Sequence, residues 1–120
     1  MKLSEKQKEL LSRIKFVVFS TSSNLNQPRS TIVQVSKAED DRIIITDNEM
    51  RITRENLLKN DKVFILAFEK DYSYCLKISG KAEYETSGKC FDFVKSLEAN
   101  KGFYPKGVII VHIENIEEFK

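Results

Sequence analysis

Cysteine, histidine and glycine are scarce in this chain of 120 residues, and each shortage excludes a class of chemistry. Two cysteines and one histidine cannot assemble the usual four-ligand zinc set within one chain. Cys75 and Cys90 form no CxxC pair, so we expect two reduced thiols that serve packing. The four glycines form neither a GxGxxG nor a GxxxxGK pattern, which excludes the classical dinucleotide-binding and P-loop folds.

Catalytic groups of the common hydrolases are also missing. The one histidine, His112, lies within an apolar stretch, where we expect a packed and hydrogen-bonded imidazole rather than a base. Carboxylates are plentiful, but those at 39–41 and 114–118 have the pattern of solvated surface. The sequence therefore predicts neither a nucleophilic triad nor a pair of glycosidase carboxylates.

Long apolar runs are absent, and no stretch approaches the roughly 20 residues that a membrane-spanning helix needs. The segment from Met1 to Gln7 is too polar for a secretory signal, so we expect a cytoplasmic protein without a membrane partner. Hydrophobic residues make up 41% and charged residues 32% of the chain, as in a single globular domain over 1–120. Twenty basic and 18 acidic residues are interleaved, which disfavours nucleic-acid binding.

The order of apolar and turn segments predicts six strands and three short helices. A capping box at Ser4 and Gln7 begins the first helix, Asn60 ends the second in a left-handed conformation, and Thr86 or Ser87 caps the third, which ends at 100–102. Closure into a barrel would remove exposed strand edges, so the predicted fold class is mainly β (α+β), with helices plugging the openings. Strands are expected at 16–21, 30–35, 42–46, 63–68, 74–86 and 106–113, and the second helix near 50–59.

The most informative segment, 46–63, has the pattern of a strand end, a polar turn, a short helix and a buried strand. Asn48 or Glu49 would begin this helix and place its first backbone N–H groups beside Arg51 and Thr53. A helix N-terminus, a guanidinium and a hydroxyl can together bind an anion, so the segment predicts a phosphate site. The same local sequence also fits an ordinary solvated first turn. The neighbouring strands supply further donors that favour the anion site: Arg29, Thr31, Gln34, Ser36 and Thr46.

The order of these motifs resembles the pyridoxamine 5′-phosphate oxidase-like superfamily of FMN-binding split barrels, particularly its small single-domain members. The likeness runs from about Phe16 to the end of the chain. It rests on the second strand with its preceding turn (27–35), the end of the third strand (45–47), the helix segment (53–60) and the ISGKAE run (78–83).

The resemblance implies a six-stranded antiparallel split β-barrel that forms a homodimer, with two FMN molecules at the subunit interface. It also implies which residues contact each FMN. Thr31, Ile32, Val33 and Gln34 would flank the isoalloxazine and ribityl chain, Ile45 and Thr46 would line the site, Arg51 and Thr53 would bind the phosphate, and the second subunit would contribute Tyr74 or Cys75 and Phe103 or Tyr104.

By resemblance, the function would be that of a flavoprotein oxidoreductase or electron carrier for a small molecule, with no residue identified as catalytic. True pyridoxamine 5′-phosphate oxidases extend further and carry basic residues for the substrate phosphate, so that activity is not predicted. Ile52 stands where family members often carry a basic residue, which leaves a second hypothesis: a dimer that has lost flavin and acts as a binding protein. In a third hypothesis, a deazaflavin or haem takes the place of FMN. For haem, His112 is the one histidine that the chain could offer as a ligand.

Overall fold

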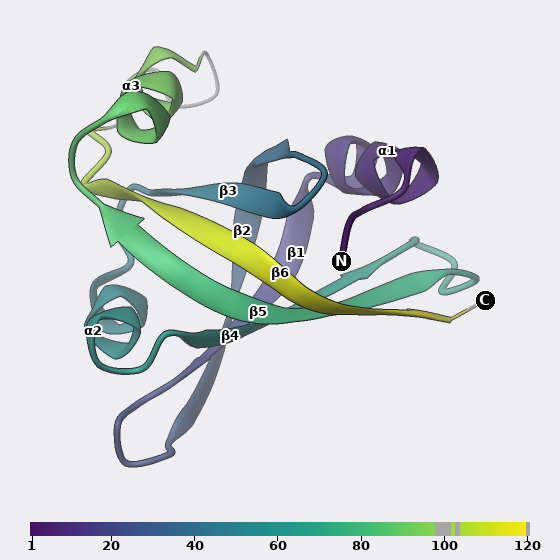
Figure 1. Cartoon of the computed structure of the whole chain (residues 1–120), viewed down its shortest axis with the longest axis horizontal. Helices are drawn as coiled ribbons and strands as arrows, with labels where there is room; N and C mark the ends of the chain where they lie inside the picture. Colours follow the sequence, from purple (N-terminus) through teal and green to yellow (C-terminus); the bar gives the residue numbers. More distant parts are fainter. Residues whose placement is uncertain (98–101, 103, 120) are drawn as a thin grey trace.

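Six strands and three helices make up the computed structural model, which describes residues 1–97, 102 and 104–119 (Figure 1). None of these helices is long and apolar enough to cross a membrane. In chain order the elements are α1 (Glu5–Ile14), β1 (Phe16–Ser22), β2 (Pro28–Ala38), β3 (Arg42–Asp47), α2 (Arg51–Lys59), β4 (Lys62–Phe68), β5 (Cys75–Glu85), α3 (Lys89–Ser96) and β6 (Gly107–Phe119).

The strands form a closed antiparallel barrel in the order β1-β2-β3-β6-β5-β4. β4 closes the ring by pairing with β1, where Leu66 lies opposite Val18. The predicted fold class, a mainly β, six-stranded antiparallel barrel with three helices, is confirmed. Closure leaves β1 and β4, which would be edge strands in an open sheet, paired with each other.

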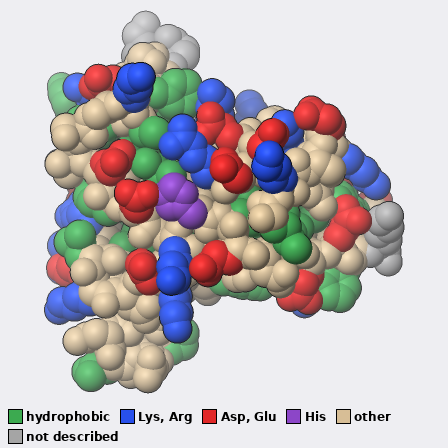
Figure 2. Space-filling model, viewed as in Figure 1, with side chains coloured by type: hydrophobic (Ala, Val, Ile, Leu, Met, Phe, Trp, Pro, Cys, Tyr) green, Lys and Arg blue, Asp and Glu red, His purple; other side chains and the backbone are tan. Residues whose placement is uncertain are grey.

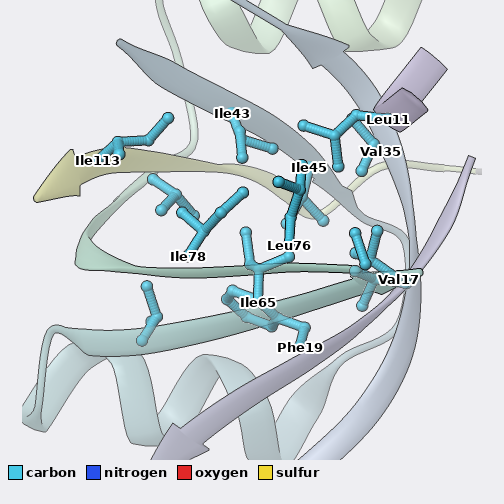
Figure 3. Packing of buried hydrophobic residues seen from close by; sticks show 14 of the residues in the cluster. Leu11, Val17, Phe19, Val35, Ile43, Ile45, Ile65, Leu76, Ile78 and Ile113 are labelled. Carbon is cyan, nitrogen blue, oxygen red and sulfur yellow. The ribbon is translucent and has the colours of Figure 1, made fainter. Parts of the chain in front are cut away.

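Alternate residues of the strands fill the barrel, as their period-2 pattern predicts. Figure 3 shows Phe19, Ile65, Leu76 and Ile78 converging on the interior, and each of them is fully buried. Leu11 of α1 packs into the same cluster. Full burial of one such side chain contributes about 1.5–3 kcal/mol, so the long strands and the first helix are stabilised by one shared core.

The first helix begins as predicted. The Gln7 backbone N–H donates to Ser4 Oγ at 3.2 Å, and the Ser4 N–H donates to Gln7 Oε1 at 2.9 Å, which completes the capping box. The helix ends at Lys15, whose φ of 64° is unusual for a residue with a side chain.

The boundaries of α2 differ from the prediction at both ends. Its N-cap is Met50 rather than Asn48 or Glu49, because the Asp47 carboxylate binds the Met50 N–H and fixes the turn before it. Asn60 is extended (φ −145°, ψ 109°) and not left-handed. Its side chain donates to the Ser23 carbonyl at 3.4 Å.

The third helix also departs from the prediction. Gly88, with φ of 100°, precedes it in place of a Thr86 or Ser87 cap, because glycine readily adopts a positive φ. The helix ends at Ser96, and residues 100 and 101, where its end was predicted, lie outside the described residues. Instead of plugging the barrel, α3 packs Val94 on the outer side of β3 and β6, in a cluster with Ile44, Val108 and Ile110.

The last strand is longer than predicted, and its histidine is exposed. β6 continues beyond Ile113 to Phe119 because it pairs with the first half of β5, where Cys75 lies opposite Phe119. The predicted packed imidazole is wrong: the His112 side chain is 48% exposed and hydrogen-bonds Glu83. Figure 2 shows basic and acidic side chains interspersed on the face that carries the histidine.

We predict that Gly80→Ala strongly destabilises the fold. The register of β5 and β6 shifts between Ser79 and Gly80, and a Cβ at Gly80 would lie 2.2 Å from the His112 carbonyl oxygen. Backbone must move to relieve this contact, so we expect a loss of about 2–4 kcal/mol in the free energy of unfolding, as for overpacked interiors. Urea denaturation measures it. Ser79→Ala, on the exposed neighbour, is the control, and equal stability of the two variants would contradict the prediction.

Candidate functional site

A cleft of about 610 Å³ lies along β2. Its lining comes from β2 (31–38), Thr46 of β3, the turn at 48–50 before α2, Ser12 and Lys15 at the end of α1, and Leu97 after α3. The volume falls within the roughly 300–1,000 Å³ typical of small-molecule and cofactor sites. All three helices thus border on one opening beside a single strand.

The cleft lies where β2 changes its pairing. β2 pairs with β1 from Pro28 to Gln34, whereas its pairs with β3 begin only at Val35, opposite Ile45. Among the described residues, the 28–34 stretch therefore has a strand partner on one edge only. Backbone N–H and C=O groups on the other edge need partners, and they are suited to a ligand with a polar rim.

Polar side chains stand at the point where β2 and β3 meet. Ser36 Oγ and Thr46 Oγ1 lie 2.8 Å apart, across the irregular register between Val35 and Lys37. Gln34, two residues before Ser36 on the same strand, is exposed. Hydroxyl and amide groups of this kind both donate and accept hydrogen bonds, so the cleft can bind a heteroatom-rich ligand without a formal charge.

A buried carboxylate stands directly behind this wall of the cleft. Asp47, the last residue of β3, is fully buried. Its Oδ1 accepts the Met50 N–H at 2.7 Å, and its Oδ2 accepts Arg54 Nη1 at 2.9 Å and the Tyr84 hydroxyl at 2.5 Å. A buried charge is tolerated only when it is paired and hydrogen-bonded, and Asp47 meets both conditions. This cluster joins the end of β3, the start of α2 and β5.

The same contacts shift the pKa of two members of the cluster. Burial, together with the hydrogen bond to Asp47, raises the pKa of Tyr84 to about 12. Hydrogen bonding to Tyr84 and to Asp47 raises the pKa of Arg54 above its ordinary value. The tyrosine is therefore a neutral donor and the guanidinium a fixed cation at neutral pH.

Five of the predicted contact residues line the cleft: Thr31, Ile32, Val33, Gln34 and Thr46. Ile32 is 71% exposed, whereas the side chain of Val33 turns into the barrel core. The structure thus brings the second-strand residues and Thr46 of the third strand together, although they are distant in the sequence.

The other predicted residues of the site lie outside the cleft lining of the described chain. Ile45 is fully buried in the barrel core, and Thr53 is buried in α2. Arg51 is exposed and forms a 3.4 Å ion pair with Glu55.

The residues expected from a second subunit are also placed elsewhere. Tyr74 is buried, donates its hydroxyl to Glu118 and has Lys6 Nζ 4.6 Å from its ring centroid. Cys75 is half-buried opposite Phe68 on β4. Tyr104 is 86% exposed, and residue 103 lies outside the described residues.

Sequence reasoning missed the Asp47 cluster, although two signals pointed to it. An aspartate at a strand end, three residues before a helix N-cap, is a recognisable turn-forming pattern. Tyr84 occupies an inward position in the alternation of β5, where its hydroxyl needs a partner. The pairing of these two residues across β6 follows only from the topology.

The structure is thus a six-stranded closed barrel with a cleft beside its second strand and a helix starting at the cleft wall. A sequence profile of the pyridoxamine 5′-phosphate oxidase family matches residues 3–120, and the chain belongs to that family. An uncharacterised protein of Methanocaldococcus jannaschii, MJ0282, is 29% identical over 125 residues, which cover 100% of this chain and 83% of that protein.

Two solved structures are similar in fold. HupZ of Group A Streptococcus has a TM-score of 0.86 at 22% identity, covering 97% of this chain and 98% of that one. An FMN-binding protein of Syntrophomonas wolfei has a TM-score of 0.79 at 18% identity, covering 97% of this chain and 85% of that one. At these identities the similarity establishes the shared fold.

We predict that the Asp47 cluster makes stability depend on pH in the alkaline range. An unfolded tyrosine loses its proton near pH 10, whereas folded Tyr84 keeps it to about pH 12. The unfolded state binds fewer protons between these values, so the free energy of unfolding falls as the pH rises from 10 to 12. Urea denaturation across this range should show a shallower fall for Tyr84→Phe than for the unsubstituted protein. Parallel curves for the two proteins would refute the assignment.

Proposed function

We propose that this chain is an FMN-binding flavoprotein, with FMN held in the cleft along β2. The observation that carries the proposal is the one-edged stretch of β2, which lines a cleft ending at the start of α2. Membership of the pyridoxamine 5′-phosphate oxidase family supports it.

The lining suits a flat, heteroatom-rich ring. Backbone groups of Thr31 to Gln34 and the Gln34 amide would hydrogen-bond the rim of the isoalloxazine, and the exposed Ile32 side chain offers apolar contact. Ser36 and Thr46 would bind hydroxyl groups of the ribityl chain. These groups are uncharged, as expected for the uncharged part of FMN.

The phosphate would lie near the start of α2. The N-cap residue, Met50, has no side-chain oxygen to accept the hydrogen bonds that a capping serine or aspartate would take, and the first turn contains no acidic residue. A helix start of this kind favours an anion. Arg51, exposed and paired only with Glu55 at 3.4 Å, could exchange that surface ion pair for the phosphate at little cost.

Bound FMN supplies reversible one- and two-electron chemistry, and the protein supplies orientation and electrostatics. The ionisable side chains that line the cleft are Lys15, Lys37 and Glu49. We therefore propose an oxidoreductase or an electron carrier for a small molecule, with redox chemistry residing in the flavin.

We predict that the purified protein binds FMN and that Arg51→Ala weakens binding about tenfold, since a hydrogen bond to a charged group contributes about 1.5–3 kcal/mol. FMN titration followed by visible absorption measures affinity, and a rise in melting temperature gives an independent readout. Lys59→Ala, at the other end of α2, is the control. A colourless protein that binds no added FMN would refute the proposal and favour a split barrel without flavin.

We further propose that the protein is a homodimer, with the cofactor at the subunit interface. Val18, Ile32 and Leu66 lie opposite one another across β2, β1 and β4, on the outer side of the barrel. Phe16, 59% exposed, extends this apolar band. Contiguous exposed apolar surface of this kind is typical of a protein interface. Because Ile32 belongs both to the band and to the cleft, a second copy on the band would also border the bound FMN.

We predict that Val18→Glu converts a dimer into a monomer, because it places a charge in the middle of the band. Sedimentation velocity measures the oligomeric state, and the variant should also bind FMN less tightly. Leu58→Glu, on α2 and 68% exposed, is the matched control and should leave the dimer intact. A wild-type protein that is monomeric at micromolar concentration would overturn the dimer proposal without bearing on the fold.

A further inference from the structure

We infer that Asp47, Arg54 and Tyr84 are positioning residues for the phosphate end of the cleft, although none of the three lines it. The inference rests on the proposed FMN site and deepens it. It assigns a role to a buried charge cluster, centred on Asp47, that the proposed cofactor contacts do not use.

The cluster holds the cleft wall from behind. The wall consists of Asn48, Glu49 and Met50, and these residues lie between Asp47 and the first turn of α2. Asp47 binds the far end of this turn through the Met50 N–H at 2.7 Å, and it binds the helix itself through Arg54 at 2.9 Å. One carboxylate therefore fixes both the shape of the turn and the direction in which α2 starts.

Tyr84 fixes that carboxylate from the other side of β6. The strand order places β6 between β3 and β5, and Gly107 of β6 lies opposite Asp47. A Cβ at Gly107 would lie 2.5 Å from the Tyr84 hydroxyl oxygen and from Cζ. The tyrosine reaches Asp47 over the one residue of this strand pair that has no side chain. The contact between Tyr84 and Asp47 therefore requires glycine at position 107, because a side chain there would collide with the tyrosine.

Besides linking α2 to Asp47, Arg54 neutralises the charge of that carboxylate. A buried carboxylate at a helix start would oppose a phosphate bound there, because like charges repel strongly where water is excluded. The Arg54 guanidinium neutralises Asp47, so the helix start remains attractive to an anion. Arg54 would then raise phosphate affinity without touching the phosphate, which distinguishes it from Arg51.

The experiment compares FMN with riboflavin, which lacks the phosphate. For Tyr84→Phe we expect about a fivefold loss of FMN affinity and an unchanged riboflavin affinity, since only the phosphate end is displaced. Arg54→Met should show the same selective loss and serves as the second variant if Tyr84→Phe folds poorly. Fluorescence titration of both flavins with the full chain gives the ratio.

The control separates positioning from general stability. Asn56 Nδ2 donates to Thr21 Oγ1 at 3.1 Å, a buried hydrogen bond that ties the middle of α2 to β1. Thr21→Val should lower the melting temperature and leave the ratio of FMN to riboflavin affinity unchanged. A merely structural cluster would behave like this control: in Tyr84→Phe and Arg54→Met both flavins would then weaken equally, and the inference would be overturned.

The two proposals fail in different ways. If the unsubstituted protein binds neither flavin, the proposed function is wrong and the inference falls with it. If the unsubstituted protein binds FMN and the ratio in both cluster variants equals that of the unsubstituted protein, the inference alone is wrong. A selective loss of FMN affinity supports both.

Discussion

The change of partners along β2 is the constraint on which the site depends. A strand in a closed barrel normally satisfies its backbone on both edges, yet β3 joins β2 only from Val35 onward. Closure is nevertheless complete, because β4 pairs with β1 and β6 runs the length of both β3 and β5. The barrel thus stays closed while this stretch of β2 keeps one strand edge available for a ligand.

Two separate cores support this arrangement. The barrel interior receives Leu11 of α1 and Leu57 of α2, so two of the three helices that border the cleft are anchored in the same packed cluster. The outer cluster under α3 stiffens β3 and β6 from the other side. Close-packed interiors transmit small displacements, so the geometry of the cleft is set by residues that lie well behind it.

Much of the fold followed from periodicity, and the misses have physical causes. The alternation of Leu76, Ile78 and Ala82 predicted a half-buried strand, and the structure confirms it. His112 was misplaced because an apolar neighbourhood in sequence was taken for burial, whereas β6 is buried on both faces only from Gly107 to Val111 and His112 follows as an exposed residue. The predicted caps of α2 and α3 were wrong because the Asp47 carboxylate binds the Met50 N–H and because Gly88 adopts a positive φ, and single-residue preferences show neither.

Of the site residues that the family resemblance implied, those of β2 and Thr46 lie along the cleft; the β2 residues do so together because neighbours on one strand stay together in any fold. The sequence could not predict that Tyr84 donates to Asp47, because that contact depends on the register of three strands. The FMN-binding roles of all the residues assigned to the site, on this chain and on a second subunit, stay predictions.

The open edge of β2 also affects the risk that newly made chains pair wrongly with other chains. An unpaired strand edge is a template for another extended chain, and proteins usually protect such edges. In the stretch from Pro28 to Gln34, the Ile32 side chain is exposed, and few charged side chains are present to discourage pairing with another strand. A ligand in the cleft would cover this strand edge and so protect the chain against misassembly. The supply of ligand would then affect the lifetime of newly made chains.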